Sequence, residues 1–271
     1  MRADIALVEK GFATSRNRAQ ELIAKGRVFL LAAGLRKPVT KPSQQIESHQ
    51  QLEVNQDQAH ADYVSRGGLK MKGALEKTRI DVRGFRVLDL GISTGGFTDC
   101  LFQAGVRTVV GVDVGHGQLA QELHKELEPG GRLKLFEGTN ARDLSSANLL
   151  EANGGHKFDL IVIDVSFISL TLVLPEATHY LLQAAPILAL VKPQFEVGRE
   201  GLGKNGIVKN VALYNDVELK IRTTCDLSGL TVEDYFESSI EGSDGNREFF
   251  VYARAAQLSL LSLGSVAGVS G

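Results

Sequence analysis

The stretch from Val87 to Asp99, which reads Val-Leu-Asp-Leu-Gly-Ile-Ser-Thr-Gly-Gly-Phe-Thr-Asp, constrains the fold of this chain more than any other. It begins as a short apolar run, turns through glycines, and continues with apolar residues at helical spacing through Leu101 and Phe102. A strand, a tight glycine turn and a helix start form the nucleotide-binding corner of an α/β sheet. Glycines let the backbone approach a ligand closely, and the helix start offers unpaired N–H groups.

The glycine turn departs from the dinucleotide fingerprint, in which three glycines are spaced G-x-G-x-x-G. Here Gly91 is followed by Gly95 and Gly96, and Asp89 lies inside the strand end. A carboxylate at that position disfavours a pyrophosphate and suits a cationic ligand, such as the amino acid end of S-adenosylmethionine. The stretch alone leaves two interpretations open: a methyltransferase, or another Rossmann-type nucleotide binder.

Length and composition set the class of protein. A chain of 271 residues, 43% hydrophobic and 23% charged, can bury a substantial core as an ordinary globular protein of one large or two small domains. The only cysteines are Cys100 and Cys225, which predicts a reducing compartment without disulfides. We find no secretory leader and no apolar run near the ~20 residues that span a bilayer. These features predict a cytoplasmic protein.

The net charge of −2 conceals an asymmetry along the chain. Residues 1–45 contain nine Lys or Arg and three Asp or Glu, so the remaining residues carry the negative charge. A basic N-terminal segment on an acidic body indicates polyanion binding by that segment. The alternative is a merely solvated basic face.

The N-terminal segment reads as two short helices, residues 4–10 and 15–25, followed by strands at Arg27–Leu31 and Gln51–Val54. This pattern resembles the S-four-type RNA-binding domain through residues that share its helix and strand positions: Arg16, Ala19, Gln20, Ile23, Gly26, Arg27 and Val28. It departs from that domain at residues 30–34, where a polar turn is more usual. We expect residues 1–60 to form this domain. The basic residues expected to contact RNA are Arg2, Arg16, Arg18, Lys25, Arg27, Lys37, Lys41 and Arg66.

Residues 61–68 read as a linker, and a helix is predicted over Leu69–Lys77. The sequence Ser-Arg-Gly-Gly at 65–68 fits a flexible turn. It fits equally well a loop that closes over a phosphate or nucleotide, because two glycines lie beside two cations.

Strand and helix signals alternate over residues 84–255 and predict a doubly wound, mostly parallel α/β sheet. The remaining strands are expected at 107–112, 133–136, 158–163, 187–191, 231–236 and 248–252, with helices at 118–127 and 208–228. The long polar loop 194–206 could act as a lid. Residues 256–271 form a tail without a clear role.

The loops after these strands supply candidate cofactor contacts, since ligands of open α/β sheets bind at strand carboxyl ends. Asp113 lies 22 positions after Gly91, where an acid binds ribose hydroxyls, although it could instead cap a helix. The loop at 138–143 either lines an adenine pocket or is a simple turn. The expected cofactor contacts are Asp89, Gly91, Ser93, Thr94, Gly95, Gly96, Phe97, Asp113, Val114, Asn140, Ala141 and Asp164.

Four ionisable residues stand at element ends near this crevice: Lys70, Asp164, Lys192 and Glu248. Lys192 follows five apolar residues, and apolar surroundings make a lysine a candidate base. The alternatives are a strand-edge charge for Glu248 and a helix-face charge for Lys70. The set resembles the Lys-Asp-Lys-Glu tetrad of FtsJ-like ribose 2′-O-methyltransferases.

Residues 2–255 as a whole resemble the TlyA family, in which an S-four-type domain precedes an FtsJ-like methyltransferase domain. The segments that carry this resemblance are Tyr63–Lys70, Asp89–Asp99, Asp164–Leu170, Val191–Glu196 and Gly245–Glu248. Ile92 replaces the family's more usual Ala in the glycine turn.

The resemblance implies a Rossmann-like methyltransferase domain over residues 69–255 that uses S-adenosyl-L-methionine to methylate a cytidine 2′-hydroxyl of ribosomal RNA. It implies that Lys192 accepts the hydroxyl proton, Asp164 orients Lys192, and Lys70 and Glu248 position the hydroxyl. The expected partners are ribosomal RNA or ribosomal subunits, with no metal, membrane or protein partner. The alternatives are a haemolysin-like membrane-acting protein and a catalytically idle RNA-binding assembly factor.

Overall fold

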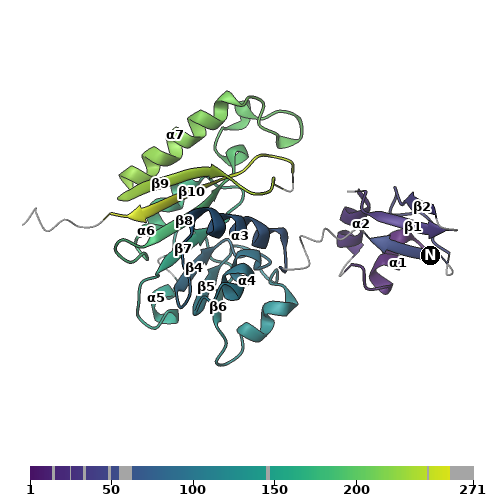
Figure 1. Ribbon diagram of the computed structural model, residues 1–271, viewed down its shortest axis with the longest axis horizontal. Coiled ribbons are helices and arrows are strands. Elements are labelled where there is room, and N and C mark those ends of the chain that lie inside the picture. The colour runs from purple at the N-terminus through teal and green to yellow at the C-terminus, as the bar shows by residue number, and fades with distance from the viewer. Residues whose placement is uncertain are drawn as a thin grey trace, which may run out of the picture. The chain divides into compact units, whose positions relative to one another are not determined.

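A computed structural model describes residues 1–13, 16–24, 26–32, 35–47, 50–54, 63–144, 147–242 and 244–256. The chain divides into two compact units, Met1–Asp62 and Tyr63–Gly271. Each unit has its own hydrophobic core, and Figure 1 shows the elements of both. No helix among the described residues is long and apolar enough to cross a membrane.

The N-terminal unit packs two helices, α1 (Ala3–Glu9) and α2 (Arg16–Ala24), with a three-stranded antiparallel sheet of order β2-β1-β3. The strands are β1 (Val28–Ala32), β2 (Leu35–Pro38) and β3 (Gln51–Val54). Its core gathers apolar side chains from both helices and the sheet, among them Leu7, Ile23 and Val28. This is the small α+β unit that the sequence predicts.

Strand β2 was not predicted, because the sequence indicates strands in this segment only at residues 27–31 and 51–54. Residues 35–38 instead pair antiparallel with β1, with Ala32 opposite Leu35 and Phe29 opposite Pro38. An edge strand needs no apolar alternation on its solvent face, and it tolerates a proline, so its sequence carries no strand signal.

The C-terminal unit is built on a seven-stranded sheet of order β6-β5-β4-β7-β8-β10-β9. The strands are β4 (Arg86–Leu90), β5 (Thr108–Val112), β6 (Leu133–Phe136), β7 (Leu160–Ile163), β8 (Pro186–Val191), β9 (Leu230–Glu237) and β10 (Phe249–Ala255). All neighbouring pairs from β6 to β8 are parallel, and β10 runs antiparallel to both β8 and β9. The predicted doubly wound, mostly parallel sheet is confirmed.

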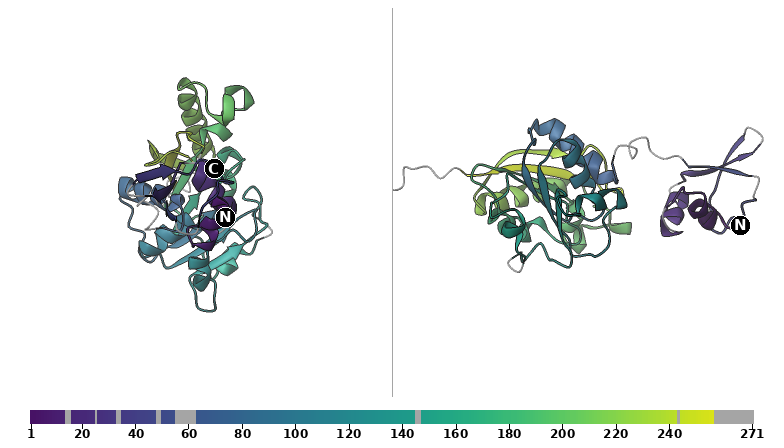
Figure 2. Two further views of the ribbon diagram at one scale, coloured as in Figure 1. Left: turned by 90° about the vertical axis from the view of Figure 1, so that its right-hand side faces the viewer. Right: turned by 90° about the horizontal axis from the view of Figure 1, so that it is seen from below.

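Helices cover both faces of this sheet, as the right-hand view of Figure 2 shows. One face packs against α3 (Arg66–Thr78) and α4 (Gly96–Gln103), and the other against α5 (Leu149–Ala152), α6 (Leu174–Thr178) and α7 (Ala212–Leu227). Alternate residues of β10 serve the two cores: Phe250 packs with the α3 side and Val251 with the α7 side.

Helix α3 corrects a prediction, since it begins at Arg66 rather than Leu69. Gly67 and Gly68 lie in its first turn and form neither a flexible turn nor a phosphate loop. A Cβ at Gly68 would collide with the Tyr63 side chain, and one at Gly67 would lie 3.6 Å from the Gly96 Cα atom of α4. Gly68 therefore allows close packing against Tyr63, whereas a Cβ at Gly67 would make only ordinary contacts.

Two further boundaries differ from the sequence expectation. The helix predicted over 118–127 is a short 3₁₀ helix, η2 (Gln121–Glu126), and α7 begins at Ala212 rather than at residue 208. The loop 194–206 contains three 3₁₀ turns, η4 (Pro193–Phe195), η5 (Arg199–Gly201) and η6 (Lys204–Gly206). Its role as a lid stays a prediction, and the tail beyond residue 256 lies outside the described residues.

Substitution of Gly96 by Ala should destabilise the C-terminal unit by about 1–3 kcal/mol through overpacking. The new Cβ would lie 2.9 Å from the Gly68 backbone nitrogen and 3.1 Å from the Gly67 Cα atom, so two helices would have to separate. Gly67→Ala is the matched control, because its Cβ would meet only ordinary contacts of 3.5 Å or more. Urea unfolding that ranks Gly67→Ala as the more damaging change would contradict this packing.

Candidate active site

The carboxyl ends of four parallel strands meet at one edge of the large sheet. Leu90 at the end of β4 lies opposite Val112 of β5 and Ile163 of β7, and Ile163 lies opposite Ala189 of β8. The chain leaves β4 toward β5 on one side and later returns to β7 on the other, so the strand order reverses at β4. Such a reversal opens the crevice in which α/β sheets bind ligands. The residues that follow these strands are Gly91, Asp113, Asp164 and Lys192.

The turn after β4 requires glycine. Gly91 has φ +86°, and a Cβ there would lie 2.5 Å from the Asp164 carbonyl oxygen. Gly95, with φ +87°, stands just before the first residue of α4 and packs on Leu119 and Leu123. Ser93 has a positive φ of +47° although it is not a glycine. The turn therefore brings its own backbone against the end of β7.

Asp113 fixes this turn from the neighbouring strand. One carboxylate oxygen accepts the Ser93 N–H at 2.8 Å, and the other accepts the Gly115 N–H at 2.7 Å. These contacts show that Asp113 organises two loops rather than capping the helix predicted after it. Each oxygen keeps a further lone pair for a ligand hydroxyl.

Asp89 is fully buried beneath the same turn. Its Oδ2 atom accepts the Thr98 hydroxyl at 2.6 Å, and its Oδ1 atom has no hydrogen-bond partner among the described residues. Burial raises the pKa of the Asp89 carboxyl to about 7, the Thr98 hydrogen bond lowers it, and the charges of Asp164 and Asp113 raise it further. An unpaired buried acceptor of this kind suits a ligand that brings positive charge or an N–H group.

The four candidate catalytic residues form two ion pairs. The Lys192 Nζ atom lies 2.6 Å from an Asp164 oxygen and donates to the Ser166 hydroxyl at 2.8 Å. The Lys70 Nζ atom on α3 donates to Glu248 Oε2 at 2.5 Å, and only 8% of Lys70 and 3% of Glu248 is exposed. The simpler interpretations as solvated edge or face charges are therefore wrong.

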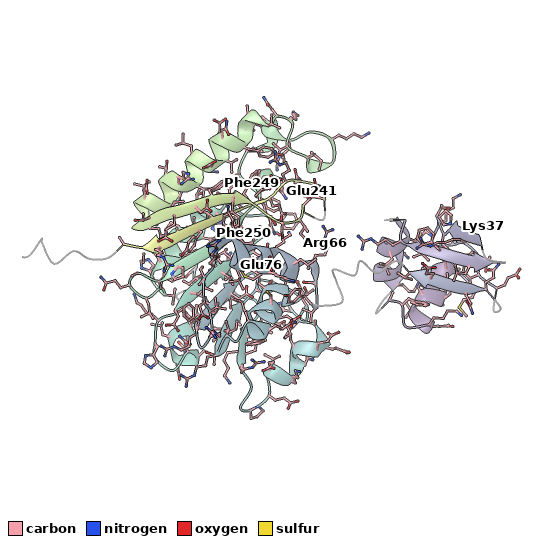
Figure 3. All side chains as sticks on the ribbon, in the orientation of Figure 1. Lys37, Arg66, Glu76, Glu241, Phe249 and Phe250 are labelled. Carbon is pink, nitrogen blue, oxygen red and sulfur yellow. The ribbon has the colours of Figure 1, made fainter. Side chains whose placement is uncertain are left out.

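Strand register brings the two pairs to the same end of the sheet. Val191 lies opposite Phe249, so Lys192 and Glu248 are the next residues on adjacent antiparallel strands. Figure 3 marks Phe249 at this end of β10. Two lysines and two carboxylates at one ligand crevice can orient a hydroxyl group and exchange its proton.

Phe167 belongs to this region, and sequence reasoning gave it no role. Its ring is 90% exposed, its φ is +64°, and its centroid lies 5.2 Å from that of Phe195. A bulky residue in this backbone region is a rare, strained conformation that clusters at functional sites. Neither the exposure of a side chain nor its φ angle can be predicted from a single sequence. Only the motif at residues 164–170 pointed to this position.

Glu196 is the second residue that the sequence did not single out. Its buried carboxylate accepts the Ser169 hydroxyl at 2.6 Å, the Leu170 N–H at 2.8 Å and the Lys220 ammonium at 2.8 Å. It thereby ties the loop after β7, which carries Phe167, to the loop after β8, which follows Lys192.

The other predicted cofactor contacts have mixed surroundings. Ser93, Thr94 and Val114 are exposed at the crevice edge, and Ala141 packs partly against the core. Asn140 accepts the Arg142 N–H at 3.0 Å through its side chain. The Phe97 ring packs in the core 6.1 Å from Phe250, so only its backbone could contact a ligand.

The predicted RNA contacts divide between the units. Lys37 and Lys41 are exposed, Arg2 and Arg16 both bind Asp4, and Arg27 is partly buried. Lys25 and the Arg18 side chain lie outside the described residues. Arg66 lies in α3 of the C-terminal unit and donates to the Glu241 carbonyl oxygen at 3.1 Å. Figure 3 labels both residues.

The strand order, the glycine turn and the paired lysines define a methyltransferase-type α/β domain. The family model for FtsJ-like methyltransferases matches residues 63–255, and that for the S4 domain matches residues 1–30. The chain belongs to the FtsJ-like methyltransferases, in the TlyA group that joins an S4 domain to this fold. The resemblance found in the sequence is confirmed.

Individual relatives cover most of the chain. The 16S/23S rRNA (cytidine-2′-O)-methyltransferase TlyA of Mycobacterium tuberculosis is 41% identical over 253 residues, which covers 93% of this chain and 89% of that protein. Hemolysin A of Brachyspira hyodysenteriae is 33% identical, with 93% and 99% covered. A solved structure of a provisionally named hemolysin from Streptococcus thermophilus has a TM-score of 0.71 at 33% identity, with 94% and 88% covered.

The buried Asp89 carboxyl makes a testable link between pH and stability in the ligand-free protein. Its pKa rises from 3.8 to about 7 on folding, so the folded chain holds the proton that the unfolded chain releases. The free energy of unfolding should therefore fall as pH rises from about 4 to about 7. Asp89→Asn can keep the Thr98 hydrogen bond but has no titrating group at this position. Its free energy of unfolding should therefore lack this dependence on pH.

The stability of Asp89→Asn relative to wild type should grow between about pH 5 and pH 7.5, by about 2.5 kcal/mol. Urea unfolding of both proteins across this range measures the difference, in which the other titrating groups cancel. Parallel pH curves would show that Asp89 is ionised throughout.

Proposed function

We propose that this chain transfers a methyl group from S-adenosyl-L-methionine to the ribose 2′-hydroxyl of a cytidine in ribosomal RNA. The two Lys–carboxylate pairs beside a methyltransferase-type glycine turn carry this proposal. The relative from Mycobacterium tuberculosis is named for this reaction. The N-terminal unit, which has an S4 match and a basic segment, supports RNA as the substrate.

The residues of the crevice fit the methyl donor. The backbone at Gly91, which leaves no room for a Cβ, and the unpaired Asp89 oxygen would hold its amino acid end. Asp113 would accept the ribose hydroxyls through its remaining lone pairs. S-adenosylmethionine supplies an electrophilic methyl group on a positively charged sulfur, and the acids at positions 89 and 164 favour that charge.

Lys192 and its partners would prepare the acceptor. Asp164 and Ser166 fix the position of the Lys192 Nζ atom, which in its neutral form could take the 2′-hydroxyl proton as the methyl group passes from the sulfur to the ribose oxygen and leaves a neutral thioether behind. Lys70 and Glu248 would hold the ribose in line with the methyl group. Alignment of this kind supplies much of the acceleration in a direct displacement.

Phe167 would hold the nucleobase of the acceptor. Phe167 is the next residue after Ser166, whose hydroxyl accepts a hydrogen bond from Lys192, and its ring is exposed. Stacking on an aromatic ring stabilises an unstacked base by about 1–3 kcal/mol. Phe195 supports the ring from one side, and Glu196 anchors the loop that carries it. The strained φ at Phe167 is then the consequence of presenting the ring to solvent.

The proposal is tested by transfer of labelled methyl from S-adenosylmethionine to isolated ribosomal subunits and to naked ribosomal RNA. Wild type should label RNA, and Lys192→Ala should lose at least about 100-fold in rate while it still binds the cofactor. Lys134→Ala, which removes an exposed lysine on β6, is the matched control and should retain full activity. Full methyl transfer by Lys192→Ala would overturn the assigned role, and cofactor binding without RNA label would favour an idle assembly factor.

Phe167→Gly separates function from stability, because the two should change in opposite directions. Glycine adopts φ +64° without strain, so the variant should unfold at an equal or higher temperature than wild type. Its kcat/KM for RNA should fall about tenfold through lost stacking. Phe167→Tyr keeps an aromatic ring and should keep most of the activity. Unchanged RNA kinetics in the glycine variant would exclude Phe167 from substrate binding.

A further inference from the structure

We infer that Asp4 is a positioning residue that holds the guanidinium groups of Arg2 and Arg16 together as one preformed site for a phosphate of RNA. The inference rests on the proposed function only in taking RNA as the ligand. It assigns a role to a buried acid inside a basic, RNA-binding unit, where an acid would otherwise be expected to weaken binding.

A single carboxylate organises the whole cluster. Asp4 accepts Arg2 Nε at 2.9 Å and Arg2 Nη2 at 3.1 Å in a forked pair, and it accepts Arg16 Nη2 at 3.0 Å. Gln20 and the Ile5 N–H donate to it at 3.1 Å each. Both guanidinium groups bond the same Oδ2 atom, so they are direct neighbours.

The burial of the three side chains differs in a way that suits a ligand site. The Asp4 side chain is 0% exposed, whereas those of Arg2 and Arg16 are 42% and 57% exposed. A guanidinium has five N–H donors, and Asp4 takes two from Arg2 and one from Arg16. Most N–H donors of both arginines therefore remain able to bind a ligand, while the N–H groups that face Asp4 are held by its carboxylate.

Electrostatics explains why the acid is needed. Two guanidinium groups this close repel each other, and a long arginine side chain loses rotamer freedom when it binds a phosphate. The Asp4 carboxylate offsets the repulsion and fixes both side chains before RNA arrives. The Arg2 hydrogen bond holds the pKa of Asp4 well below its usual range against the opposing effect of burial, so it stays ionised. The cluster keeps one net positive charge and a planar donor surface that matches phosphate oxygens.

The backbone at both arginines is fixed as well. Arg2 forms an isolated bridge with Gln45, and the Ala3 N–H donates to the Gln44 carbonyl oxygen at 2.8 Å. Arg16 is the first residue of α2. The site is thus assembled from the chain start, α1 and α2 around one carboxylate.

The test is the RNA affinity of the full chain, measured by fluorescence anisotropy with a labelled RNA hairpin and with isolated ribosomal subunits. Asp4→Asn removes a negative charge, which on charge alone should tighten binding. Preorganisation predicts the opposite sign, a loss of about five- to tenfold. Glu9→Gln makes the same charge change at an exposed position of α1 and should leave affinity equal or slightly tighter.

Two further variants test the inference even if Asp4→Asn fails to fold. Arg2→Lys and Arg16→Lys keep every charge and remove the planar guanidinium, and each should weaken binding about two- to fivefold in a chain that still shows a cooperative thermal transition. Equal or tighter binding by folded Asp4→Asn, or unaltered affinity in both lysine variants, would overturn the inference. Because affinity is measured without methyl transfer, a failure here is distinct from a failure of the proposed reaction.

Discussion

The register of the parallel strands is the constraint on which the site depends. Because β4, β5, β7 and β8 end at one edge, the residues just beyond them converge without any further folding device. Gly91, Asp113, Asp164 and Lys192 are far apart in the chain, and each is simply the next residue after a buried strand. The antiparallel strand β10 then adds Glu248, since its register places that residue beside Lys192.

Ion pairing compensates the charges of the candidate catalytic residues. Lys70 compensates Glu248 where both are buried, and Lys192 compensates Asp164 where both are partly buried. Removal of one partner would leave an uncompensated charge, which is more damaging than loss of the pair. Asp89 is the exception, because one of its oxygens has no partner among the described residues. That unmatched acid is the feature that makes the crevice ready for a positively charged ligand.

Much of this arrangement could be predicted from the sequence, for a physical reason in each case. Apolar runs and glycine spacing identify the sheet and its turn, and ionisable residues directly after apolar runs identify Asp164 and Lys192. Phe167 and Glu196 could not be found in this way, because a positive φ and a buried hydrogen-bond network arise only from tertiary contacts. The start of α3 at Arg66 could not be predicted because Gly67 and Gly68 are poor helix formers, and the close packing that requires Gly68 arises only from tertiary contacts. Strand β2 was missed because an edge strand carries no apolar alternation.

Identification of the methylated nucleoside tests the central claim most directly. After reaction of ribosomal subunits with S-adenosylmethionine and the full chain, the RNA is digested to nucleosides and analysed by mass spectrometry. The two ion pairs at the crevice predict that the added mass lies on the ribose, and the proposed function predicts that the nucleoside is 2′-O-methylcytidine. A methyl group on the base instead, or no modified nucleoside from a chain that binds both the cofactor and RNA, would contradict the assignment of Lys192 and its partners to a ribose hydroxyl.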